Sequence, residues 1–88
     1  MKAKKYIGIY KDELGNTRNM VQTDYTSKKD FAYDLRANGY RVIIVLTKEQ
    51  IEMVKNYDVL NDTEEERKFI GKLYRLNRDL IEYIEEVL

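Results

Sequence analysis

Residues 40–51 read YRVIIVLTKEQI, and this stretch decides the fold. The β-branched and apolar run within residues 40–46 is typical of a strand covered on both faces, so we expect it to be the most buried strand of the chain. Thr47 follows directly, and Gln50 lies three residues after it, which is the spacing of a capping box at the start of a helix. The stretch therefore predicts a buried strand that passes straight into a helix.

Another helix is predicted on the N-terminal side of that strand. Ser27 is a good capping residue, and Asp30 follows at the third helical position. Gly39 comes after Asn38 and can adopt the left-handed conformation that ends many helices. The face of this helix that we expect to be buried consists of Phe31, Ala32 and Leu35.

The first residues of the chain have the pattern of a β-hairpin. Residues 4–11 alternate with the period of a strand, and residues 17–23 make a second, more polar strand. Between them, residues 12–16 read DELGN and supply the glycine and asparagine of a turn. The strand at residues 40–46 can pair antiparallel with the first strand or parallel with the second, and the sequence leaves both orders open.

The C-terminal part is predicted to be helical. Thr63 and Glu66 repeat the capping-box spacing, and the pattern after them can continue as one helix to Leu88, about 37 Å long at 1.5 Å per residue. We therefore predict an α+β fold in which a small three-stranded sheet, made of a β-hairpin, a helix and a strand, is followed by two helices, the last one long. Residues 1–88 should form a single domain, with a ββαβ sheet part at residues 1–46 and a helical part at residues 47–88.

The composition excludes most catalytic chemistry. The 88 residues contain no histidine and no cysteine, and their single serine, Ser27, is already assigned to a helix cap. Nucleophilic triads, imidazole catalysis and zinc sites need the missing residue types. Acidic groups around Asp12 and at residues 62–66 lack the spacing of a calcium loop and are typical of a turn and a helix start. We expect no enzyme activity, no metal, no cofactor and no small-molecule substrate.

The C-terminal segment carries more apolar surface than a small sheet can cover. Its apolar residues recur at spacings of three and four and so share one side of a helix. If exposed, they would form a patch of roughly several hundred Å², and a second copy of the chain is the natural cover. This favours a non-catalytic protein-interaction or regulatory accessory module, most simply a homodimer. Its predicted interface consists of Leu76, Leu80, Ile81, Tyr83, Ile84, Val87 and Leu88.

Two other functions are compatible with the sequence. A nucleic-acid binder would stack bases on tyrosines of the hairpin and hold phosphates with basic neighbours, using Lys4, Lys5, Tyr6, Tyr10, Lys11 and Arg18. Tyrosine rings that cover one face of the sheet beneath a helix explain the same residues, and we favour that interpretation. The second alternative is a phage-type or mobile-element inhibitor that presents its acidic last helix to a nucleic-acid enzyme, although the formal net charge of zero argues against extensive mimicry.

The sequence also bears on location. No stretch approaches the roughly 20 apolar residues of a membrane helix, and the first residues lead into a strand pattern rather than a signal-peptide core. The absence of cysteine fits a reducing compartment. We therefore expect a cytoplasmic protein with no membrane partner.

Overall fold

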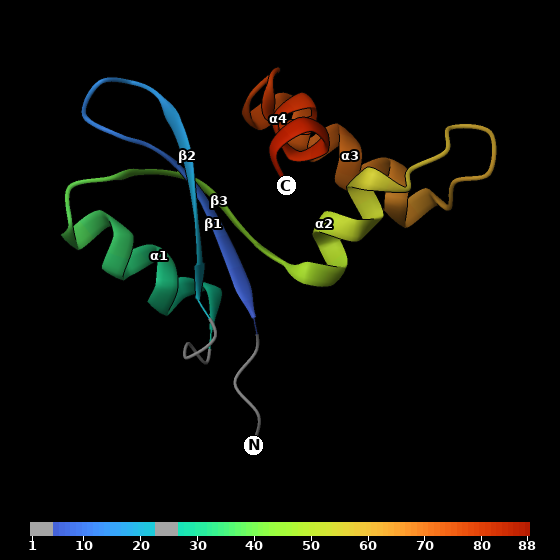
Figure 1. Cartoon of the computed structure of the whole chain (residues 1–88). Coiled ribbons are helices and arrows are strands. Elements are labelled where there is room, and N and C mark those ends of the chain that lie inside the picture. The colour runs from blue at the N-terminus through green and yellow to red at the C-terminus, as the bar shows by residue number, and fades with distance from the viewer. Residues whose placement is uncertain (1–4, 23–26) are drawn as a thin grey trace. The chain divides into compact units, whose positions relative to one another are not determined.

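The computed structural model describes residues 5–22 and 27–88, and it divides into two compact units at residues 1–48 and 49–88. Within the described residues it contains a three-stranded antiparallel sheet and four helices, in the order ββαβααα (Figure 1). The predicted α+β class with a ββαβ sheet part is therefore confirmed. Of the helices formed by the described residues, none is both long and apolar enough to cross a bilayer.

The sheet unit contains the strands β1 (Tyr6–Lys11), β2 (Thr17–Gln22) and β3 (Arg41–Thr47) in the order β2-β1-β3. Both neighbours of β1 run antiparallel to it, which decides between the two strand orders left open by the sequence. The expectation that β3 would be the most buried strand was wrong. Five of the six residues of β1 are buried against two of seven in β3, because β1 is central and β3 lies at an edge of the sheet.

The hairpin turn between β1 and β2 is organised by one carboxylate. Oδ1 of Asp12 accepts the backbone N–H groups of Leu14 at 3.0 Å and Asn16 at 2.9 Å, while Oδ2 accepts from Nε of Arg18 at 3.1 Å. These bonds, with that of the Asn16 amide first, hold the pKa of Asp12 below its usual value. Gly15 takes a φ of 81°, which residues other than glycine rarely adopt. The turn prediction is confirmed.

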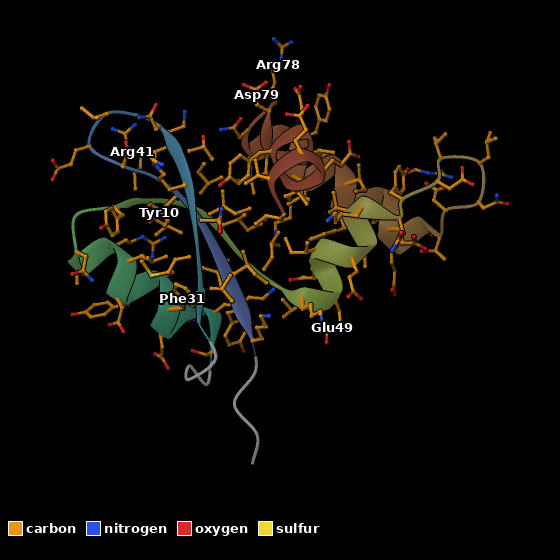
Figure 2. All side chains as sticks on the ribbon, in the orientation of Figure 1. Tyr10, Phe31, Arg41, Glu49, Arg78 and Asp79 are labelled. Carbon is orange, nitrogen blue, oxygen red and sulfur yellow. The ribbon has the colours of Figure 1, made fainter. Side chains whose placement is uncertain are left out.

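Helix α1 (Lys28–Ala37) covers one face of the sheet (Figure 1). The Ser27 hydroxyl accepts the Asp30 amide at 3.2 Å, and Gly39 ends the helix region with a φ of 87°, so both predicted boundary signals are confirmed. Figure 2 shows Phe31 and Tyr10 in the layer between the helix and the sheet. The core of this layer consists of the buried residues Tyr6, Tyr10, Phe31, Ala32, Leu35 and Val45, with Met20, Tyr40 and Val42 partly buried around them.

A β-bulge interrupts the pairing of β1 with β3. Ile9 lies opposite Ile44 and Tyr10 opposite Val42, so Ile43 is an extra residue in β3. Side chains of a strand point alternately to its two faces, and the extra residue shifts this alternation by one position. Val42 and Val45, three positions apart, therefore both pack in the core against α1. Leu46 alternates to the opposite face and is only 1% exposed, so the run is apolar because residues on both faces of β3 are buried.

The helical unit contains α3 (Glu64–Leu76) and α4 (Leu80–Val87), which pack against each other, and it begins within α2 (Lys48–Lys55). The helix predicted after Thr47 is present as α2. The capping box at Thr63 is also confirmed, because its hydroxyl accepts the Glu66 amide at 3.1 Å and the Glu66 carboxylate accepts the Thr63 amide at 3.3 Å.

The segment expected as one long helix is two helices, separated by residues 77–79. Asn77 adopts extended backbone angles, with φ −163° and ψ 123°, and its side-chain Oδ1 accepts the Asp79 amide at 2.9 Å. Asparagine and aspartate compete with the helix by bonding the local backbone in this way. The break shortens each helix and turns α4 back beside α3.

Candidate interaction surfaces

The predicted interface residues of the C-terminal helices fall into three groups. Leu80 and Ile84 are fully buried, so they stabilise the fold and are not available to a partner. Ile81, Tyr83 and Leu88 are half-buried. Only Leu76 and Val87 are largely exposed, at 50% and 56%, and Tyr74 adds a third exposed apolar side chain at 58%. The remaining apolar surface is therefore smaller than the sequence pattern indicated.

Charges of opposite sign lie on the two helices that carry this surface. The second half of α3 and the turn after it contribute Lys72, Arg75 and Arg78, all exposed. Helix α4 contributes the exposed carboxylates of Glu82, Glu85 and Glu86 and has no basic residue in its last turn. Figure 2 shows Arg78 projecting away from the helices at the turn between them. The unit thus presents a basic stretch and an acidic stretch close together in sequence.

The hairpin residues of the nucleic-acid alternative do not form an exposed stacking platform. Tyr6 and Tyr10 are 4% and 7% exposed, and the Tyr10 ring lies 4.5 Å from that of Tyr40, centroid to centroid. Arg18 is paired with Asp12. Lys5 is exposed and Lys11 half-exposed, and Lys4 lies outside the described residues. The burial of both rings favours the core interpretation of these tyrosines.

An open groove between α1 and β3 was missed by the sequence analysis. Its volume is about 490 Å³, and residues of only these two elements line it. The lining consists of Lys28, Lys29, Ala32, Tyr33, Arg36, Val42, Ile43, Ile44 and Val45. The helical spacing of the basic residues was visible in the sequence, but the edge position of β3 that creates the groove was not. No carboxylate is part of the lining, so the groove is cationic around an apolar floor.

A polar cluster of Tyr57, Asp62 and Arg67 holds the segment between α2 and α3 in place. The Asp62 carboxylate accepts from the Tyr57 hydroxyl at 2.7 Å and from Nε and an Nη of Arg67 at 3.1 and 3.0 Å. The Arg67 guanidinium, followed by the Tyr57 hydroxyl, lowers the pKa of Asp62 to about 2. Bonding to Asp62 in turn raises the pKa of Tyr57. Because these groups satisfy one another, the cluster serves as a structural clasp.

Among the residues that the structure describes, no three acidic side chains come together as a metal site. Of the acidic residues in these two groups, Asp12 organises the hairpin turn, Asp62 bonds Tyr57 and Arg67, and Glu66 completes the capping box of α3. Comparisons with protein-family models, with curated proteins and with solved structures find no match. Function is therefore argued from the surfaces of the chain itself.

Proposed function

We propose that the chain is a non-catalytic protein-interaction module that pairs with a second copy of itself through α3 and α4. The observation that carries the proposal is the pair of apolar side chains left exposed on these helices, Leu76 and Val87. Val87 lies one position from Leu88 and one helical turn from Tyr83, both half-buried, so docking would remove further apolar surface from water together with these two side chains.

The charge pattern supports a second copy as the occupant. A two-fold interface places residue i of one chain on residue j of the other and repeats the contact in reverse. Such an arrangement can place Arg75 at the end of α3 and Arg78 in the turn after it against the acidic α4 of the partner copy, and the two-fold axis repeats this contact. Complementary charge of this kind favours the correct orientation and speeds association. Because the exposed apolar area is small, we expect a weak and reversible dimer.

Sedimentation equilibrium over a range of protein concentrations tests the proposal. We expect the mass to rise toward twice the 10.6 kDa of one chain as concentration increases. The double variant Leu76→Gln and Val87→Gln, which alters no charge, should shift dissociation to at least about tenfold higher concentration.

The matched control replaces two exposed apolar residues outside this surface, Leu14→Gln and Leu60→Gln, and should dimerise as the parent does. High salt, at about 1 M where the Debye length is about 3 Å, should weaken the parent dimer. A parent chain that stays monomeric at millimolar concentration, or a control that dissociates as readily as the test variant, would refute self-association through these helices.

With this function we keep the prediction of a cytoplasmic location. Its support is the absence of cysteine from the sequence, which suits a reducing compartment. Weak reversible pairing of a small module is also a common way for a regulatory protein to respond to its own concentration.

A further inference from the structure

The β3 edge of the sheet is open among the described strands. β3 pairs with β1 on one side only, and no described strand lies on its other side. An edge strand presents backbone N–H and C=O groups that can pair with another extended chain. Many peptide-recognition domains bind their targets by accepting an added strand at such an edge.

The groove lies along this edge, so the side chains that line it are next to any segment that pairs with β3. Its floor is apolar, formed by Ala32 of α1 with Val42 and Val45 of β3. The bulge at Ile43 is what brings the two valines to the α1 face, as described above. A strand added to β3 would therefore lay alternate side chains over this floor and toward α1.

The side of α1 that borders the groove is cationic. Lys29 and Arg36 line the groove and are exposed, and Tyr33 between them is 72% exposed. The acidic residues of the same helix, Asp30 and Asp34, are not part of the lining, since at 100° per residue they fall on another side. The charge next to the open edge thus has one sign.

We infer that the groove between α1 and β3 binds an extended, acidic segment of another protein, which adds a fourth strand next to β3. Backbone pairing supplies the strand geometry, and carboxylates on alternate residues of the bound segment reach Lys29 and Arg36. This site goes beyond the proposed self-association and belongs to the other unit of the chain, so either can fail without the other.

A second copy of this chain is a poorer occupant of the groove. Pairing two β3 edges around a two-fold axis would bring the cationic sides of both α1 helices together, and like charges across an interface are unfavourable. The dense acidic stretches of this chain lie in α3 and α4, which are helices and not extended segments. An acidic segment from a different protein can be both negatively charged and extended, as the groove and the strand edge require.

The test measures binding of a fluorescent peptide of alternating glutamate and valine to the full chain by anisotropy. We expect saturable binding that weakens with salt, and no comparable binding of the same peptide with lysine in place of glutamate. On binding, amides of Arg41–Thr47 should gain protection from hydrogen exchange, because edge amides become paired. Absence of binding, or protection elsewhere only, overturns the inference.

Two charge reversals locate the site. Lys29→Glu and Arg36→Glu should each weaken peptide binding at least about tenfold, because each replaces a charge-assisted contact with repulsion. The two positions lie at opposite ends of α1, so their helix-dipole effects on stability have opposite sign while their effect on binding is the same. Lys55→Glu on α2 makes the same change of net charge and should leave peptide binding unchanged.

Two further ligands separate strand addition from simple charge attraction. N–H groups of a strand point alternately to its two sides, so N-methylation of one alternate set of peptide amides should abolish binding and methylation of the other set should not. Equal binding of the two methylated peptides overturns the strand geometry. Tighter binding of oligothymidylate than of the acidic peptide would identify a nucleic-acid groove and overturn the inference as well. Leu76→Gln with Val87→Gln should not alter peptide binding, which keeps this test independent of dimerisation.

Discussion

The two units of the chain are specified by different kinds of interaction. In the sheet unit, residues 1–48, the central strand pairs with a strand thirty or more positions away, and the core joins residues from the beginning, middle and end of the unit. In the helical unit, residues 49–88, the identifiable signals act over a few residues, as in the Thr63 capping box and the Asp62 clasp. Local signals can be read from sequence alone, whereas long-range pairing needs the fold.

The units also differ in charge. Residues 1–48 carry ten basic and five acidic side chains, and residues 49–88 carry six and eleven. The surplus of positive charge in the sheet unit suits an anionic partner at the α1–β3 groove. The helical unit has both signs on neighbouring helices, which suits pairing with a copy of itself.

The largest effect should come from the core of the sheet unit. Phe31 is 1% exposed between α1 and the sheet, so Phe31→Ala should lower the free energy of unfolding by about 3–5 kcal/mol. Tyr33→Ala removes a well-exposed aromatic ring from the same helix and should change it by less than about 0.5 kcal/mol. Urea denaturation of both variants measures the difference, and similar losses would contradict the assignment of the core.

Replacing glycine by alanine should change stability in opposite directions at two positions, one in each unit. A Cβ on Gly8 would lie 2.7 Å from Cδ1 of Leu35 and 3.1 Å from the Phe31 ring, so Gly8→Ala should cost about 1–3 kcal/mol. A Cβ on Gly71 would meet nothing within 4 Å, so Gly71→Ala should stabilise α3 by about 0.5–1 kcal/mol. Thermal unfolding shows both signs, and a destabilising Gly71→Ala would indicate a close neighbour at that position.

Removal of a helix cap should lower the free energy of unfolding by less than removal of a core side chain. Thr63→Ala removes the hydroxyl that accepts the Glu66 amide and should destabilise the protein by about 1 kcal/mol. Thr63→Ser retains the capping oxygen and should be close to neutral. Circular dichroism melting of the two variants tests this, and equal destabilisation would show that the methyl group and not the cap matters.

The last prediction concerns acid, because the stability that Asp62 contributes is constant around neutral pH and is lost only at low pH. Because the folded pKa of Asp62 is about 2 and its usual value is 3.8, this carboxylate stabilises the fold fully above pH 3.8 and loses that contribution as the pH falls toward 2. Asp12 in the sheet unit has a lowered pKa as well and contributes in the same direction. The melting temperature of Asp62→Asn should therefore change less between neutral and acid pH than that of the parent. An equal change in the two proteins would contradict the role of the Arg67 contact.

Much of the secondary structure follows from local sequence. The Asp12 turn and the Ser27 and Thr63 caps each depend on a side chain and a backbone group a few residues apart, and the Gly39 stop depends on the positive φ of that one residue. All are present as predicted. The break at Asn77 had a visible signal too, in Asn77 and Asp79, but the apolar stripe continues across it and indicated one helix. Here a local polar preference outweighed the periodic pattern.

The candidate surfaces were less predictable. Leu80 and Ile84 share the apolar stripe with Leu76 and Val87, and no property of the sequence separates the buried pair from the exposed pair. The groove depends on which strand lies at the edge, and the sequence left that open. Burial depends on neighbours that are distant in the chain, so periodicity alone could not assign it.

By itself the sequence determined the types and approximate bounds of the elements other than the break at Asn77, the absence of histidine and cysteine chemistry, and the face of α1 that meets the sheet. Tertiary structure alone decided that β1 is the central strand, that a bulge at Ile43 turns two valines of β3 toward α1, and that a cationic groove opens beside that edge. The physical reason is that caps and turns are formed by bonds between near neighbours, whereas strand order and exposed edges depend on the free energy of packing the whole unit.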